Sequence, residues 1–277
     1  MYTRHFGLLL PPFQESLDPY WFVEGPAQEE AVARLLYLVE GCRRCGALVG
    51  PAGSGKSLLL AAVEAHVRRL PRQTLRVDLL GKSGRELLWE TASGLGLGPQ
   101  SDATPRNLWR MLEDRLAGCR QFDTPLVLCL DDVDRSASDC LAVVERLQKL
   151  LVEGGCPATL LLGLRSAKSP VWQASLSQLV DLAVELPPLD EAATGHYIAE
   201  RLALAGAVRP LFDTGALRQI HLETEGLPRA INRLCELSLI AGMAVQVDLV
   251  TASIVSQVST AETLRRSPGE PSFRHAA

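Results

Sequence analysis

The chain has 277 residues, of which 47% are hydrophobic and 22% charged, and its formal net charge is −4. This content can bury a full core, which excludes a globally disordered protein, and no run of about eighteen uninterrupted apolar residues predicts a transmembrane helix. The acidic balance disfavours a dedicated nucleic-acid binder, because it gives no overall basic footprint.

The seven cysteines are an odd number, and no signal peptide precedes them, which predicts a reduced, cytoplasmic protein. Cys42 and Cys45 have C-x-x-C spacing, but no second pair and no paired histidine offers the two further ligands that zinc needs. A metal or redox role for this pair is therefore disfavoured.

A glycine-rich loop follows the first predicted strand, 46–50, and leads into a helical pattern that begins near Leu58. It matches the P-loop pattern G-x-x-x-x-G-K-[ST] and consists of Gly50, Pro51, Ala52, Gly53, Ser54, Gly55, Lys56 and Ser57. The glycines let backbone N–H groups turn inward, where they bind phosphates together with the positive end of the next helix. Lys56 is expected to contact the β- and γ-phosphates, and Ser57 to bind Mg²⁺. The loop and Leu58 thus predict a site for Mg²⁺ and a nucleoside triphosphate.

Short apolar runs then alternate with longer helical stretches, which predicts an α/β fold with a parallel sheet flanked by helices. The expected strands are 46–50, 74–80, 125–130, 158–163 and 182–186, and the expected helices are 27–41, 56–70, 83–95, 105–120 and 136–153.

The run that precedes Asp131 and Asp132 is a buried-strand pattern, about 75 residues after Lys56. A carboxylate at the carboxyl end of a parallel strand faces the ligand crevice, so Asp131 is the expected partner of Ser57 in binding Mg²⁺. Asp132 would orient or activate the attacking water.

After residue 188 the strand signal disappears, and helical patterns follow at 190–206, 213–225, 228–242 and 248–258. We expect a nucleotide-binding α/β domain over 1–188, with residues 1–45 as its amino-terminal segment and helix. A small all-helical domain would follow over 189–258, and a flexible tail over 259–277.

The amino terminus resembles that of ExeA/GspA-type AAA+ ATPases, which carry a Y-x-x-x-F-G-L…P-F…D-P segment before the P-loop. The matching residues are Tyr2, Phe6, Gly7, Leu8, Pro12, Phe13, Asp18 and Pro19, and the likeness extends to Gly226-Leu227-Pro228-Arg229-Ala230-Ile231-Asn232. By this resemblance the helical domain is an AAA+ lid and Arg229 is its sensor-2 arginine, which contacts the γ-phosphate. The nucleotide is ATP, and residues around Phe6, Pro12 and Phe13 are candidates for the adenine pocket.

The resemblance also implies an oligomerising ATPase with a protein partner, associated in better-known members with envelope work such as assembling secretion or pilus machinery. Many longer relatives add a transmembrane helix and a peptidoglycan-binding domain. We expect no direct anchoring of this chain, so a secretion role needs a partner that provides the membrane link.

Three positions depart from the family pattern. Asp132 stands where the family usually has glutamate, Leu164 stands at the polar sensor-1 position, and Leu179 stands where a candidate arginine finger is typical. These departures favour slow hydrolysis and a nucleotide-controlled switch, unless Arg165 compensates for one of them.

Two alternatives stay open. A DNA-associated AAA+ adaptor of the transposition type would use arginine-rich patches near 66–69 and 229–233, and its DNA binding would depend steeply on salt. A non-hydrolytic scaffold would use bound ATP only to lock the core to the lid.

Overall fold

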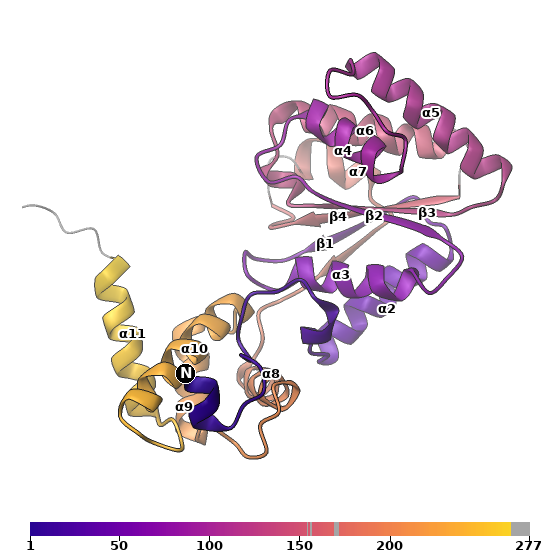
Figure 1. Ribbon diagram of the computed structural model, residues 1–277. Coiled ribbons are helices and arrows are strands. Elements are labelled where there is room, and N and C mark those ends of the chain that lie inside the picture. The colour runs from indigo at the N-terminus through magenta and orange to yellow at the C-terminus, as the bar shows by residue number, and fades with distance from the viewer. Residues whose placement is uncertain (154, 156, 169–171, 267–277) are drawn as a thin grey trace, which may run out of the picture. The chain divides into compact units, whose positions relative to one another are not determined.

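The computed structural model describes residues 1–153, 155, 157–168 and 172–266. It divides into two compact units, an α/β unit formed by Ser16–Pro187 and a helical unit formed by Met1–Glu15 together with the chain from Pro188 (Figure 1). None of the described helices combines the length and the apolar character needed to cross a membrane.

The α/β unit is built on a parallel sheet of five strands in the order β2-β3-β4-β1-β5. The strands are β1 Cys45–Val49, β2 Gln73–Asp78, β3 Leu126–Asp131, β4 Ala158–Leu164 and β5 Leu182–Glu185. All five expected strands are therefore present, each within a few residues of its expected bounds. The carboxyl ends of β1, β3 and β4 lie at one edge, because Leu130 pairs with Leu162 and Val49 with Leu164.

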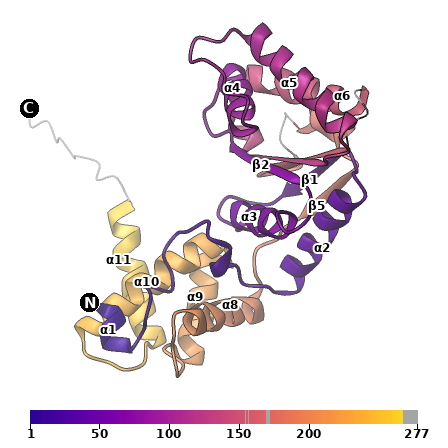
Figure 2. The same ribbon diagram turned by 45° about the vertical axis from the view of Figure 1, so that its right-hand side comes forward.

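Helices cover both faces of this sheet (Figures 1 and 2). One face carries α2 Pro26–Glu40 and α3 Lys56–Val67, and the other carries α4 Gly84–Gly94, α5 Pro105–Gln121 and α6 Ser138–Glu153. Successive strand residues point to opposite faces of the sheet and so pack in two different hydrophobic cores. Ala47 packs in the core beneath α4, α5 and α6, called the α4–α6 core, while its neighbour Leu48 packs with α2 and α3. Short turns complete the described part of this unit: η1 Pro19–Trp21, η2 Val133–Arg135, η3 Trp172–Leu176 and α7 Ser177–Leu179.

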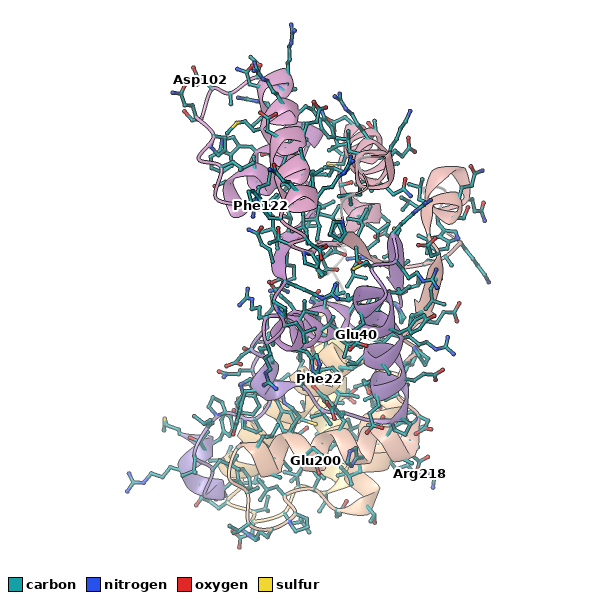
Figure 3. The ribbon with its side chains drawn as sticks, turned by 90° about the vertical axis from the view of Figure 1, so that its right-hand side faces the viewer. Phe22, Glu40, Asp102, Phe122, Glu200 and Arg218 are labelled. Carbon is teal, nitrogen blue, oxygen red and sulfur yellow. The ribbon has the colours of Figure 1, made fainter. Side chains whose placement is uncertain are left out.

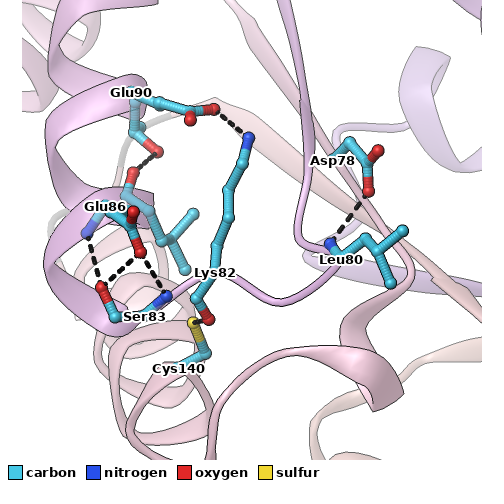
Figure 4. Close-up of polar contacts among 9 residues, drawn as sticks. Asp78, Leu80, Lys82, Ser83, Glu86, Glu90 and Cys140 are labelled. Carbon is cyan, nitrogen blue, oxygen red and sulfur yellow. Dashed lines mark hydrogen bonds and ion pairs between the residues drawn. The ribbon is translucent and has the colours of Figure 1, made fainter.

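Side-chain contacts fix the loop between β2 and α4 (Figure 4). Ser83 and Glu86 form a capping box at the start of α4, and the Lys82 Nζ lies 2.6 Å from the Glu90 Oε2. The Cys140 thiol donates to the Lys82 carbonyl over 3.1 Å and so ties the loop to α6. Within the loop the Asp78 carboxylate accepts from the Leu80 amide. These contacts hold the loop between β2 and α4, and β2 is the strand that pairs with β3.

The helical unit contains α1 Tyr2–Phe6, α8 Glu191–Leu204, α9 Thr214–Thr224, α10 Pro228–Ala244 and α11 Ala252–Arg266. Asp190 and Asp213 cap the amino ends of α8 and α9 by accepting backbone N–H groups. Glu200 and Arg218, labelled in Figure 3, are exposed on these two helices. The predicted fold class, a parallel α/β core with a helical second part, is confirmed.

Residues 1–15 were expected to belong to the α/β domain. In the structure they pack in the helical unit instead. The buried Arg201 guanidinium of α8 donates to the Pro12 carbonyl over 2.6 Å and to the Gln14 carbonyl over 3.1 Å. Phe13 is 1% exposed and lies edge-on to Phe212. Phe6, Pro12 and Phe13 are all buried within this unit, which leaves little ring surface for the adenine pocket suggested for them.

The carboxyl-terminal boundary also differs. The last helix runs over Ala252–Arg266, whereas the pattern predicted a helix over 248–258 and a tail from 259. Residues 259–266 are therefore helical. The remainder of the expected tail, 267–277, lies outside the described residues.

Candidate nucleotide site

The P-loop connects β1 to α3 and is held by the neighbouring strands. Gly53 and Gly55 have φ angles of 83° and 96°, which favour glycine. A Cβ on Gly50 would lie 2.5 Å from the Leu186 carbonyl oxygen, and the Gly50 amide donates to the Leu164 carbonyl over 3.1 Å. The loop thus needs glycine for conformation at two positions and for close approach at a third.

Lys56 is the first residue of α3 and is 6% exposed. Its ammonium donates to the carbonyl oxygens of Gly50 and Pro51 over 2.8 and 3.1 Å. Burial lowers the pKa of Lys56, Arg165 lowers it further, and the carboxylates of Asp131, Asp132 and Asp134 oppose this shift. The side chain therefore lies folded onto the loop, in the field of three carboxylates.

A buried hydroxyl in the loop fits the phosphate site predicted from the sequence. Ser54 is 3% exposed, and its Oγ has no hydrogen-bond partner among the described residues. Buried polar atoms without partners are rare and point to an absent ligand or water. Phosphate oxygens would supply the acceptor that this hydroxyl lacks.

Asp131 ends β3 and is 5% exposed. Burial raises the pKa of its carboxyl group, and hydrogen bonds from the Ser57 hydroxyl and the Asp132 amide oppose that shift. The structure thus brings together Ser57 and Asp131, the two residues predicted to bind Mg²⁺. A hydroxyl and a carboxylate are hard oxygen ligands, so this donor set fits Mg²⁺.

Asp132 directly follows this strand with a φ of 52°, in the left-handed region. Its Oδ1 lies 3.6 Å from the Arg165 Nε, and the Arg165 amide donates to the Asp134 Oδ2 over 3.0 Å. Sequence reasoning did not identify Asp134 and left the direction of Arg165 open. The available signal was a third carboxylate two residues after Asp132.

Leu164 and Leu179, the two other positions that depart from the family pattern, have different surroundings. Leu164 is fully buried in the α4–α6 core, so it offers no polar group to the site. Leu179 lies in α7 and packs partly against the same core, beside the exposed Gln178.

Arg229 is the second residue of α10 in the helical unit. Its Nε lies 3.4 Å from the Glu15 Oε1, and 65% of its side chain is exposed. Arg233 pairs with Glu262 in the same unit, and Arg68 pairs with Glu64 in the α/β unit. The sensor-2 role of Arg229 stays a prediction. Both arginines of the 229–233 patch and one of the two arginines of the 66–69 patch thus have a carboxylate partner.

The C-x-x-C pair lies where α2 leads into β1. Cys45 is fully buried, and burial, reinforced by Asp181, raises the pKa of its thiol to about 12. Cys42 is half-buried and accepts from the Arg72 guanidinium. Within the described part of the chain no three potential ligands gather to hold a metal ion.

Comparison with known proteins places this site in a family. Residues 40–167, which include the P-loop and both aspartates, match a family described as an AAA domain. The chain is 28% identical over 250 residues to the General secretion pathway protein A of Aeromonas hydrophila. The match covers 88% of this chain and 45% of that relative, so the chain spans less than half of its length.

Two solved structures share the fold. The Cdc6p of Pyrobaculum aerophilum is similar with a TM-score of 0.75 and 17% identity, over 93% of this chain and 74% of its own. The Drosophila ORC structure bound to DNA has a TM-score of 0.69 and 14% identity, over 93% of this chain and 69% of its own. Residues 40–167 thus match an AAA domain, and the chain is similar over most of its length to a General secretion pathway protein A, the ExeA/GspA-type relative expected from the sequence.

Proposed function

We propose that this protein binds ATP with Mg²⁺, hydrolyses it slowly, and uses the nucleotide state to control the conformation of a protein assembly. One observation carries the proposal: Lys56, Ser57 and Asp131 converge beside a P-loop whose buried Ser54 hydroxyl has no partner among the described residues. A cation, two hard oxygen ligands and an unsatisfied donor form a site for a triphosphate and its metal ion.

Each residue would have a distinct task. The backbone N–H groups of the loop and the Lys56 ammonium would hold the phosphates, and the lysine would exchange its two carbonyl acceptors for phosphate oxygens. Ser57 and Asp131 would hold Mg²⁺, which when bound neutralises charge on the β- and γ-phosphates. Asp132 would orient the attacking water and accept its proton.

The residues around Asp132 support slow turnover. Aspartate is one methylene shorter than the glutamate typical of the family, so its carboxylate lies about an ångström farther back. Leu164 is buried and apolar, and the described part of α7 offers no arginine at residues 177–179. An arginine supplied in trans is worth about 10³–10⁵ in hydrolysis rate in related enzymes, whereas enzymes with an arginine from the same chain still turn over at only about 10⁻² s⁻¹.

We propose that the partner is a protein. We also propose that the chain forms homo-oligomers and acts in the cytoplasm. The similarity to a secretion protein supports a role in an envelope or secretion assembly. The carboxylates paired with Arg68, Arg229 and Arg233 speak against a continuous basic surface for DNA. DNA binding that weakens steeply with salt would replace the protein assembly by a DNA-associated role.

A single-turnover experiment tests this function. Limiting radiolabelled ATP with Mg²⁺ is mixed with the purified protein, and bound ATP and released ADP are followed together. We expect ATP to be retained and converted slowly, well below about 1 s⁻¹. Lys56→Ala should abolish retention, because it removes the only side-chain cation of the P-loop itself.

Two variants separate binding from hydrolysis. Asp132→Glu should raise the rate if the carboxylate length limits turnover, while ATP affinity stays unchanged. ATP binding without any conversion, in both the wild type and Asp132→Glu, would identify a non-hydrolytic scaffold. If wild type and Lys56→Ala failed alike to retain ATP, the proposal of nucleotide binding would be wrong.

A further inference from the structure

Arg165 is the first residue after β4 and lies beside the carboxylates that follow β3. Its guanidinium Nε is 3.6 Å from the Asp132 Oδ1, and its backbone amide donates to the Asp134 Oδ2 over 3.0 Å. The preceding residue, Leu164, accepts the Gly50 amide through its carbonyl oxygen. The carbonyl before Arg165 is therefore bonded to the P-loop, and the Arg165 amide is bonded to a carboxylate of the region after β3.

Two buried atoms around this arginine have no hydrogen-bond partner among the described residues. They are the Arg165 Nε and the Asp134 Oδ1. A buried donor or acceptor without a partner destabilises the fold, and a charged one does so more strongly. The Arg165 Nε–H therefore has unused capacity for an oxyanion, since its ion pair with Asp132 is longer than a hydrogen bond.

The two cationic side chains of this site, Lys56 and Arg165, also favour the binding of an anion between them. Lys56 and Arg165 are close enough for the arginine to lower the pKa of the lysine, although the main cause of that lowering is burial. Like charges repel, so this approach is stabilised by the facing carboxylates of Asp131, Asp132 and Asp134. A triphosphate would bring further negative charge between the two cations, and Arg165 would then gain a stronger acceptor than the distant Asp132.

We propose that Arg165 is the arginine of this hydrolysis site, supplied by the same chain, which stabilises the charge that develops on the transferred phosphoryl group. Before nucleotide binds, its ion pair with Asp132 keeps the guanidinium beside the reacting position. This inference rests on the proposed ATP hydrolysis. During that reaction the water oxygen bonds to the terminal phosphorus while the bond to the bridging oxygen breaks. The bridging oxygen keeps the electron pair and leaves as ADP, and the water proton passes to Asp132 and then to the product phosphate.

The test separates transition-state stabilisation from binding. Arg165→Ala and Arg165→Lys are compared with wild type in two assays, equilibrium ATP affinity and single-turnover hydrolysis. We expect Arg165→Ala to lower the hydrolysis rate at least about tenfold while ATP affinity changes less than about threefold, because an arginine of this kind acts mainly in the transition state. Arg165→Lys should recover part of the rate, since it keeps the charge but loses the fork geometry.

A second measurement does not need turnover. ADP, Mg²⁺ and aluminium fluoride mimic the transferring phosphoryl group, and wild type should retain ADP far longer with aluminium fluoride than without it. Arg165→Ala should lose that difference and still bind ADP alone normally. Arg135→Ala is the matched control, because Arg135 is an exposed arginine three residues after Asp132 and should behave like wild type. Thermal unfolding of each variant checks that the fold is kept.

The possible results distinguish a failure of the proposed function from a failure of the proposed role of Arg165. If wild type binds no nucleotide, the proposed function itself is wrong. If wild type binds and hydrolyses ATP but Arg165→Ala hydrolyses it equally fast or faster, or traps ADP with aluminium fluoride as wild type does, the arginine role is overturned while the function stands. Binding without hydrolysis or trapping in wild type also overturns the arginine role.

Discussion

Gly163 of β4 lies against the Asp131 carboxylate of β3, so closely that a Cβ on the glycine would be 2.2 Å from the Asp131 Oδ1. The two residues are neighbours because β3 and β4 pair in parallel, with Leu130 opposite Leu162. Gly163 thus provides the space in which the expected Mg²⁺ ligand is held. No local sequence pattern marks this requirement.

Substituting Gly163→Ala should displace the Asp131 carboxylate, since the added methyl group cannot fit beside it. We expect the Mg²⁺-dependent increase in ATP affinity to fall at least about tenfold, and the fold to lose about 1–3 kcal/mol. Titration of a fluorescent ATP analogue with and without Mg²⁺ measures the first effect, and urea unfolding the second. Gly118→Ala is the control: a Cβ there meets open space within α5, so it should be neutral or stabilising by up to about 1 kcal/mol. Unchanged Mg²⁺ dependence in Gly163→Ala would contradict the packing argument.

Arg201 should be required to hold the amino-terminal segment in the helical unit. Arg201→Met keeps much of the side-chain volume but removes the donors to the Pro12 and Gln14 carbonyls, which should cost about 3 kcal/mol in the free energy of unfolding. Limited proteolysis should then cut within residues 1–15 faster than in wild type. Arg209→Ala should change stability by less than about 1 kcal/mol, because its ion pair with Asp248 is exposed. Equal stability of Arg201→Met and Arg209→Ala would show that this buried network is dispensable.

The thiols of the C-x-x-C pair should differ sharply in reactivity. Cys42 is half-buried at a chain turn, whereas Cys45 is fully buried and the pKa of its thiol is raised to about 12. Because the thiolate is the nucleophile, native protein at pH 8 should be alkylated at Cys42 well before Cys45. Mass spectrometry of iodoacetamide-treated protein measures this, in a Cys156→Ser background because Cys156 lies outside the described residues. Modification of both at similar rates would indicate an accessible dithiol and reopen a redox role.

Stability should fall in alkaline solution through Cys45. Its thiol titrates at about 9 when unfolded and at about 12 in the fold, because burial disfavours the thiolate. The contribution of the buried thiol is fully present below pH 9 and is lost as pH rises towards 12, because the unfolded chain releases the proton first. Each pH unit in this window costs up to about 1.4 kcal/mol. Urea unfolding at pH 8, 9 and 10 should show a steeper decline in wild type than in Cys45→Ala, and parallel curves would refute the assignment.

Much of the α/β unit could be predicted from the sequence because its signals are local. The five strands are short apolar runs, and the P-loop carries its glycines, Lys56 and Ser57 within eight residues. The position of Asp131 at the carboxyl end of a buried strand could be predicted because a buried run ends in carboxylates, and strands of a parallel sheet present such ends at one edge. Periodicity also located α8, α9 and α10 to within a few residues.

The amino-terminal segment could not be assigned in this way. Residues 1–15 precede the α/β unit in sequence, but they pack with helices that begin almost 190 residues later, through the bond of Arg201 to Pro12. Helix α11 was placed too early because its hydrophobic pattern is weak, and it ends only at Arg266. Contacts at such sequence separations depend on how whole elements fold back on one another.

The sequence by itself determined the residues available for the proposed chemistry, namely a P-loop, the Ser57 and Asp131 pair expected to bind Mg²⁺, and the neighbouring Asp132. Only the tertiary structure decided which other groups lie beside these residues. Gly163 makes room for Asp131, and Arg165 turns towards Asp132 while its neighbour Leu164 is buried in the core. The physical reason is that sheet register sets which side chains of β3 and β4 lie beside each other, and register arises from the packing of the entire core.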